Sequence, residues 1–194
     1  MIKSLHKYLS FLILALLQIP LYAQDVKYGL QANLSRPLGD LDPTWYGQIG
    51  YGFGLHSQIE LKSGNRLIPR VDFMEYKHDN LGQIYKFNTL SLGLDFQHRF
   101  SAKYNEKFYL TGGIGYTFAR NSFEITDAAH PVPGGIYLPN YSRSERFNAP
   151  YLAVGIGYAI NSNFSLETRY NYLKFNSPTE ATTPSLQLSL LFHL

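Results

Sequence analysis

The sequence predicts an all-β protein, an eight-stranded antiparallel up-and-down transmembrane β-barrel that follows a cleavable signal peptide. Three observations support this prediction. Segments of roughly ten residues alternate between apolar and polar side chains, as strands of such barrels do. The connections between these segments are alternately long and short. The chain is also rich in aromatic residues, with 16 tyrosines and 13 phenylalanines among 194 residues.

The first 23 residues have the composition of a secretory signal peptide. Two lysines precede an apolar run over residues 8–19, and a cleavage zone ends in Ala23. This apolar run is too short to cross a bilayer as a helix, whereas the order of its regions is typical of exported proteins. We therefore predict a signal peptide over residues 1–23 and one barrel domain over residues 24–194.

Composition argues against several classes of protein. The chain has no cysteine, which excludes a disulfide framework, a lipid-modified cysteine and a thiolate metal site. Its formal net charge is +3, two units of which come from the leader lysines, so nothing indicates nucleic-acid binding. After residue 23 no apolar run is long enough for a helical span. An exported chain with these features is expected to be β-rich, with a membrane barrel as the first candidate.

The clearest strand covers residues 48–61, QIGYGFGLHSQIEL. Its odd positions are mostly apolar, and its even positions carry glycine, amides, His56 and Glu60. Side chains alternate across a strand, so one face would meet lipid. The other face would point into a crowded interior, where glycine leaves room for larger neighbours. The same pattern predicts a strand over residues 26–34.

Six further strands complete the predicted barrel. They are expected at about 67–76, 89–97, 108–118, 152–160, 164–172 and 185–194, and the first of them alternates least clearly because it contains Pro69. The connections 35–47, 78–86, 121–148 and 174–183 are long, whereas those at 62–66, 101–106 and 161–163 are short. Hairpin barrels of the outer membrane have short periplasmic turns, long outer loops and periplasmic termini.

The inward positions predict a network of charged and amide side chains that fills the barrel. A regular turn at residues 62–66 would place Gln58 opposite Arg70. The same register would place His56 opposite Asp72. Buried charges require partners, so we interpret the set as structural. The predicted network consists of His56, Gln58, Glu60, Arg70, Asp72, Asp95, Glu167 and Arg169.

A chemical role is the alternative for the histidine in this network. His56 with Asp72 could act as a general base with an orienting carboxylate. No serine of inward parity stands beside this pair, since Ser57 points to the opposite face. A regular turn at residues 161–163 would place the last two members of the network opposite glycines, which favours packing. We therefore expect no catalytic residue, no cofactor site and no metal site.

The longest connection, residues 121–148, is expected to be a loop outside the lipid. It contains three prolines and a Gly-Gly pair, and such a segment cannot form a wall that meets lipid, where every backbone group must be hydrogen-bonded. Its aromatic and basic side chains suit contact with another surface or with anionic lipopolysaccharide. A mobile solvated loop is the alternative. The candidate contact residues are Phe123, Tyr137, Tyr141, Arg143, Arg146 and Phe147.

From about Val26 to Leu194 the pattern resembles the small outer-membrane β-barrel proteins of the OmpA transmembrane-domain and OmpX type, the porin-family β-barrel domains. That family usually ends in a terminal aromatic residue, and here Phe192 stands two residues before the end. The resemblance implies a protein of the outer membrane of a Gram-negative-type cell, inserted by the barrel-assembly machinery, with periplasmic termini. It implies contact with outer-membrane lipid and lipopolysaccharide, and with an extracellular protein or surface.

We expect a structural or interaction protein, acting in adhesion or surface binding through the loops at 35–47 and 121–148, and not an enzyme. Two alternatives stay open. One is a lipid A-modifying enzyme: the deacylases need a histidine and a serine presented together toward lipid, and the palmitoyltransferases need an apolar interior. The other is a narrow channel for small solutes, although eight strands enclose a space that side chains can fill.

Overall fold

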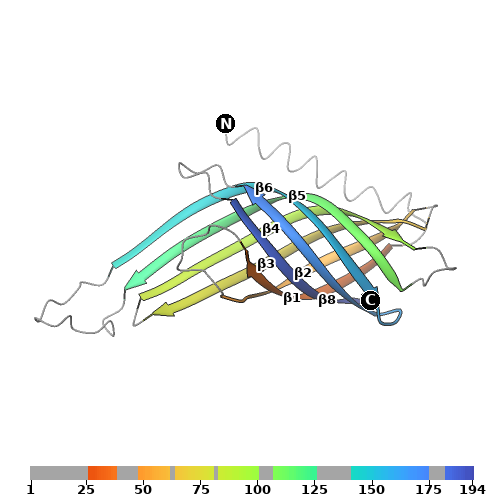
Figure 1. Ribbon diagram of the computed structural model, residues 1–194, viewed down its shortest axis with the longest axis horizontal. Coiled ribbons are helices and arrows are strands. Elements are labelled where there is room, and N and C mark those ends of the chain that lie inside the picture. Colours follow the sequence, from red (N-terminus) through yellow and green to blue (C-terminus); the bar gives the residue numbers. More distant parts are fainter. Residues whose placement is uncertain are drawn as a thin grey trace, which may run out of the picture.

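The computed structural model describes residues 26–38, 48–61, 64–80, 83–100, 107–125, 141–174 and 182–194. In these residues eight strands pair in sequence order, and the last pairs with the first, which closes the barrel (Figure 1). All of the pairings are antiparallel. The predicted eight-stranded antiparallel barrel is therefore confirmed. The strands are β1 (Val26–Pro37), β2 (Gly50–Glu60), β3 (Arg66–Asn80), β4 (Gln83–Arg99), β5 (Phe108–Ile125), β6 (Tyr141–Ala159), β7 (Phe164–Lys174) and β8 (Thr182–His193).

Side chains alternate between an apolar outer wall and an interior that is mainly polar. On β1, Leu30 and Leu34 project outward and are 50% and 52% exposed, whereas Gln31 and Asn33 project inward and are buried. Exposed large apolar residues occur on all eight strands. Such a surface is unfavourable in water but suits the hydrocarbon of a bilayer. The two faces are those that the alternation predicted.

The two ends of the barrel differ. Strands β3 to β6 have 15 to 19 residues, whereas β1, β2, β7 and β8 have 11 or 12. The additional length lies at one end, where β3 to β6 project beyond the other strands as a four-stranded sheet (left in Figure 1). We name this the extended end. The opposite end, which carries Val26 and Leu194, is the terminal end.

The extension corrects two expected loops. Within the segment 121–148, β5 continues to Ile125 and β6 begins at Tyr141, and these two residues are paired. Of the expected loop at 78–86, residues 78–80 and 83–86 are likewise strand, because β3 and β4 remain paired as far as Asn80 and Gln83.

There is a physical reason why the apolar–polar alternation did not reveal these strand ends. An apolar–polar pattern arises where one face meets lipid and the other meets the interior. Beyond the membrane neither condition holds, although backbone pairing continues. The outward face of the extension therefore carries polar residues such as Lys86, Ser122 and Ser144, and large aromatic residues occupy the inward one.

The expected register of the β2–β3 hairpin is wrong by two residues. The structure pairs His56 with Arg70 and Gly54 with Asp72, and not His56 with Asp72. It pairs Glu60 with Arg66. The parity of each side chain is unaffected, because a shift of two positions keeps every residue on the same face.

A tighter turn causes this shift. The Leu61 N–H donates a hydrogen bond to the Asn65 carbonyl at 2.8 Å, so these two residues close the hairpin. Gly64 has a φ of 76°, in the left-handed region that a three-residue hairpin loop requires near its end. The turn is therefore shorter than the expected five residues at 62–66.

Several expectations concern parts of the chain outside the described residues. These are the signal peptide at 1–23, most of the loop at 35–47, the turn at 101–106, most of the connection at 174–183, and Tyr137. No helix in the described ranges is long and apolar enough to cross a membrane.

Candidate functional site

Five charged side chains meet in the centre of the barrel. Arg70 Nε lies 2.7 Å from Asp95 Oδ2, and Arg70 Nη1 lies 3.0 Å from Glu167 Oε1. Arg169 Nη2 lies 3.1 Å from Asp95 Oδ1, and Arg169 Nη1 lies 4.0 Å from Asp72 Oδ2. These side chains are almost fully buried, so each charge depends on its partners to offset the loss of water. We name them the charged centre.

Glycines opposite these side chains provide the space. Gly113 pairs with Asp95, and a Cβ at Gly113 would lie 1.8 Å from Asp95 Oδ1. On β6, Gly155 and Gly157 face Arg169 and Glu167 of β7, as the β6–β7 register predicted. In the sequence, this cluster is therefore marked by large charged residues that lie opposite glycines on the neighbouring strand.

Asp72 joins the charged centre to the amides of β1. Asn33 Nδ2 donates to Asp72 Oδ1 at 3.0 Å, and Gln31 Nε2 donates to the same oxygen. Gln31 and Asn33 are buried, so these hydrogen bonds cannot be exchanged for water without opening the barrel. Asp72 thus connects three strands, β1, β3 and β7.

Two histidines meet at the terminal end of the interior. His56 Nε2 lies 3.1 Å from His193 Nδ1, and the rings are at 85° to each other. Gly29 pairs with His56 on one side and with His193 on the other, and a Cβ there would lie 2.4 Å from His56 Nε2. The sequence analysis placed these residues inside but did not bring them together, since only the closure register joins β8 to β1. Glu60, also in the predicted network, pairs here with Arg66 at 3.6 Å.

A serine contacts this histidine pair. Ser165 Oγ lies 3.1 Å from His193 Nε2, which is the spacing that a nucleophile and its general base would need. Arg66 Nη1 donates to Gln58 Oε1 at 2.7 Å, and this bond turns Gln58 Nε2 toward the His193 ring, 3.0 Å from Nδ1 and 3.3 Å from Nε2.

The direction of the Ser165 contact depends on the tautomer of His193. With its proton on Nε2 the neutral imidazole donates to the serine hydroxyl, and with its proton on Nδ1 it accepts from that hydroxyl. The described residues that contact Nδ1 are an amide and a second histidine, and none of their carboxylates is hydrogen-bonded to the ring. The third member of a catalytic triad, a carboxylate that orients the histidine, is therefore not found among the described residues. Among the described residues, no three His, Asp or Glu side chains are grouped to hold a metal ion.

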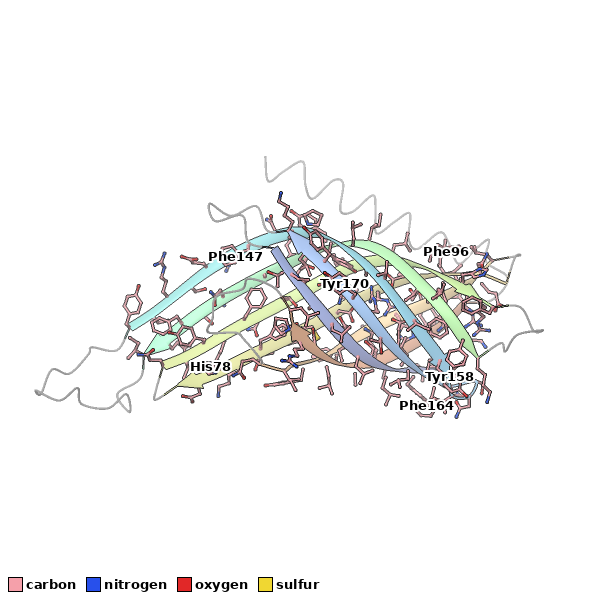
Figure 2. All side chains as sticks on the ribbon, viewed as in Figure 1. His78, Phe96, Phe147, Tyr158, Phe164 and Tyr170 are labelled. Atoms are coloured by element: carbon pink, nitrogen blue, oxygen red, sulfur yellow. The ribbon has the colours of Figure 1, made fainter. Side chains whose placement is uncertain are left out.

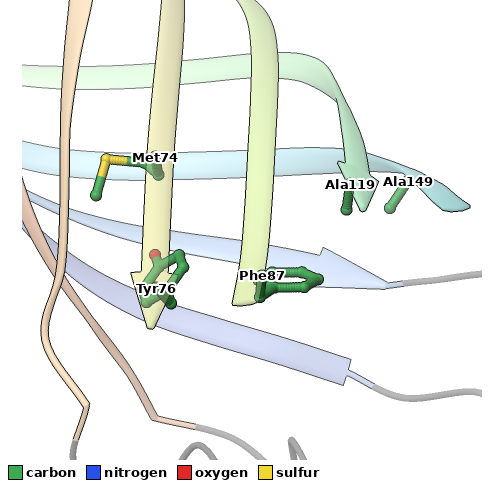
Figure 3. Close-up of a cluster of buried hydrophobic side chains, with 5 residues drawn as sticks. All are labelled: Met74, Tyr76, Phe87, Ala119 and Ala149. Atoms are coloured by element: carbon green, nitrogen blue, oxygen red, sulfur yellow. The ribbon is translucent and has the colours of Figure 1, made fainter. Parts of the chain in front are cut away.

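Toward the extended end the interior becomes apolar, which the inward pattern did not predict. Figure 3 shows the buried cluster of Met74, Tyr76, Phe87, Ala119 and Ala149 from β3, β4, β5 and β6. The Tyr76 and Phe87 rings lie 5.9 Å apart, and the Tyr76 hydroxyl donates to Ser35 Oγ at 2.9 Å. A cavity of about 50 Å³ lies between this cluster and the charged centre. Such a volume holds a few water molecules and not a wide channel.

Aromatic rings continue onto the extension. His78, Tyr85, Phe123 and Tyr141 come from β3, β4, β5 and β6 in turn, and we name them the aromatic row. Neighbouring ring centroids are separated by 6.3, 4.6 and 6.2 Å in this order. His78 lies toward the tip of β3 (Figure 2). The sequence analysis assigned His78 and Tyr85 to a loop and therefore missed them.

The predicted contact residues divide between the two faces of the extension. Phe123, Tyr141, Arg143 and Phe147 occupy odd positions of β5 and β6, which face the same side as the barrel interior. Arg146 occupies an even position and faces outward, directly opposite Arg120 of β5. The candidate site is therefore two surfaces, an aromatic one and a basic one, on opposite sides of one sheet.

Comparisons with known proteins agree with this architecture. The attachment invasion locus protein Ail of Yersinia pestis superposes with a TM-score of 0.58 at 15% identity, over 87% of this chain and 97% of that one. Neisserial surface protein A gives 0.54 at 16% identity, over 86% and 96%. The N-terminal β-barrel domain of OprF from Pseudomonas aeruginosa gives 0.51 at 13% identity, over 88% and 99%. Identities this low establish a shared fold only.

A search of curated proteins found no match to this sequence. The family described as outer membrane protein beta-barrel domain matches residues 9–192, nearly the whole chain. That match agrees with the closed barrel, its apolar outer wall and its filled interior. The chain thus belongs to the outer membrane protein β-barrel domain family.

Proposed function

We propose that this protein recognises an extracellular partner through the aromatic row of its extended end. In this proposal the leader at 1–23 directs export, the barrel-assembly machinery inserts the chain, and both termini lie in the periplasm. The extended end then faces outward, as the long-loop side of such barrels does. Lipopolysaccharide surrounds the wall at that end.

The aromatic row is the observation that carries the proposal. It crosses all four strands of the extension, and Tyr85 at its inner edge packs against the buried apolar cluster. Tyr141 is 48% exposed, and Tyr85 and Phe123 are only partly buried. Rigid aromatic side chains of this kind contribute large contact areas at protein interfaces at low entropic cost.

Arg143 adds a charge beside the row. Its side chain is 65% exposed, and it faces Phe123 across the β5–β6 pair. Glu145 binds the same guanidinium group at 2.5 Å. A structure of Ail has been determined in complex with a heparin analogue, sucrose octasulfate. A sulfated glycan is therefore a suitable first probe for this chain.

The interior supports a structural role for the barrel itself. Between the charged centre and the apolar cluster the lumen narrows to a cavity of about 50 Å³, which disfavours solute passage. The Ser165 hydroxyl contacts His193, but none of the described carboxylates is hydrogen-bonded to this ring to orient it as a general base. These two observations disfavour the channel and the enzyme alternatives.

Substitution of the row tests the proposal. Cells that display the wild-type protein or a Tyr85→Ala/Phe123→Ala/Tyr141→Ala variant are applied to heparin-coated surfaces and to cultured epithelial monolayers. We expect at least roughly a tenfold loss of retained cells, since interface aromatics commonly contribute more than 1 kcal/mol each. The matched control, Ser122→Ala/Ser142→Ala, alters the opposite face of the same hairpin and should retain binding. If cells with the row variant were retained as well as wild-type cells on both surfaces, the proposal would be refuted.

A further inference from the structure

Two arginines on the outward face of the extension have no acidic partner among the described residues. Arg120 and Arg146 are directly opposite each other in the β5–β6 pair, and both are exposed. Of the described residues, no carboxylate forms an ion pair with either guanidinium group. Like charges directly opposite each other destabilise a sheet. An anion bound between them would remove that cost.

Two carboxylates on this face have other partners. Glu124 forms an ion pair with Lys86 of β4 at 3.7 Å. Glu75 of β3 accepts a hydrogen bond from the Tyr51 hydroxyl at 2.9 Å. Among the described residues of this face Lys77 also forms no ion pair, but it lies on β3, opposite Lys86, and does not line the groove that the two arginines share.

The arginines lie directly above the apolar wall. The strand registers place Phe73, Leu90 and Phe118 in one outward row across β3, β4 and β5. The next outward row, one pleat farther from the barrel, contains Asn88, Arg120 and Arg146. The change from apolar to polar side chains marks the level where hydrocarbon gives way to head groups.

A groove joins the two rows. It has a volume of about 370 Å³, and its lining includes Phe73, Leu90 and Phe118 together with Asn88, Arg120 and Arg146. Arg120 Nε donates to Ser144 Oγ at 2.9 Å, which restrains one guanidinium group. A guanidinium group is well suited to bind phosphate because it can donate two parallel hydrogen bonds. The groove therefore offers an apolar floor for acyl chains and a cationic rim for a phosphate.

We propose that this groove binds a phosphate of lipid A in the outer leaflet, with Arg120 and Arg146 holding the phosphate and Phe73, Leu90 and Phe118 contacting an acyl chain. The proposal rests on the orientation given under Proposed function, because that orientation places the groove in the outer leaflet. It does not depend on the aromatic row, which lies on the other face of the sheet.

Native mass spectrometry of the purified barrel released from detergent micelles tests this site. The probes are bisphosphorylated lipid A, the same lipid A after removal of its phosphates, and inorganic phosphate as a competitor. We expect Arg120→Gln/Arg146→Gln to reduce the fraction of barrel that carries lipid A by about tenfold or more, equivalent to the loss of one or two charge-assisted hydrogen bonds. Dephosphorylated lipid A should bind the wild type and this variant equally.

A charge-matched control distinguishes a specific phosphate-binding site from general electrostatic attraction of the lipid. Arg36→Gln/Lys86→Gln also removes two outward cations at the extended end, and it should lower lipid A binding by no more than about twofold, as expected for screened surface charges. An equal loss in both double variants would refute the site. So would unchanged binding in Arg120→Gln/Arg146→Gln, or full competition by inorganic phosphate, which would indicate a site for the free anion.

Two further measurements keep the outcome decisive. If the double variant does not fold, Arg146→Gln alone is tested, because the Arg146 side chain, unlike that of Arg120, forms no hydrogen bond with another described residue. The Tyr85→Ala/Phe123→Ala/Tyr141→Ala variant should retain lipid A while it loses adhesion, and Arg120→Gln/Arg146→Gln should show the reverse. A failure of either proposal is therefore distinguishable from a failure of the other.

Discussion

Glycines decide which side chains meet inside this barrel. Gly29 allows His56 and His193 to approach, and Gly113 makes room for Asp95. In each case the neighbouring strand carries a polar side chain that occupies the space where a Cβ would be. A residue with no side chain is therefore as important for the interior network as the charged residues that form it.

Substitution of one such glycine should disturb the interior. At Gly29 an added Cβ would lie 2.4 Å from both His56 Nε2 and the Phe192 carbonyl oxygen, and the backbone atom cannot move aside as a rotamer can. We expect Gly29→Ala to lower the free energy of unfolding by about 1–3 kcal/mol, the usual cost of overpacking. Urea titration in lipid vesicles measures this change. Gly112→Ala is the control, since the nearest atom to its Cβ would be 4.0 Å away, and an equal effect at both positions would contradict the packing argument.

Removal of a shared acceptor should also destabilise the barrel. Asp72→Ala leaves the Gln31 and Asn33 amides and one Arg169 contact without their acceptor. Unmet buried donors cost about 1–3 kcal/mol, so the free energy of unfolding should fall by about that amount. Ser57→Ala, on the outward face of β2, is the control. Adhesion to the surfaces described above should be unchanged, and its complete loss in a folded variant would show that the network has a direct functional role.

At the scale of the strand, outward-facing side chains are apolar in the wall that meets lipid and polar in the extension beyond it. Within the wall, outward positions such as Leu55 and Val154 meet lipid, whereas outward positions of the extension such as Ser142 are polar. The same strand, β6, passes from one regime to the other without a break in its pairing. Strand length is therefore governed by backbone pairing, and the alternation reports only the part inside the membrane.

Charge at outward positions should distinguish these two regimes. Arg at Leu55 or Val154 should cost about 2–4 kcal/mol, because a guanidinium group near the midplane must leave water. Ser142→Arg, beyond the wall on the same face of β6, should cost almost nothing. The measurement is the free energy of unfolding from refolding titrations into vesicles. A uniform cost at all three positions would show that the extension also lies in hydrocarbon.

At the scale of the whole molecule, the barrel is polarised along its axis. The charged centre and the apolar cluster occupy the middle of the lumen. Of the described strands, only β3 to β6 continue past the others at one end (Figure 1). The terminal end and the extended end must lie on opposite sides of the membrane, because the wall between them is continuous.

The absence of native cysteine makes this orientation measurable. A single cysteine introduced as Ser142→Cys lies on the extension, and one introduced as Ser162→Cys lies in the β6–β7 turn at the terminal end. A membrane-impermeant maleimide should label the first in intact cells and the second only after the outer membrane is opened. The reverse pattern would invert the orientation and remove the basis of both proposals.

The sequence by itself determined the barrel and the parity of its side chains. Alternation over a strand follows directly from backbone geometry, so residues such as Asp95 and Arg169 could be assigned to the interior without a structure. The number of strands followed from the same local signal. Each of these properties depends on neighbours along the chain, which a single sequence displays.

Only the tertiary structure decided which inward residues meet. His193 contacts His56 because closure brings β8 against β1, and the short turn that ends at Gly64 moves Arg70 opposite His56. The aromatic row and the Arg120–Arg146 pair depend on cross-strand registers beyond the membrane, where no lipid imposes a pattern on the sequence. Side-chain parity is a local property of one strand, whereas contact is a property of the register between strands, and turn geometry and barrel closure determine that register.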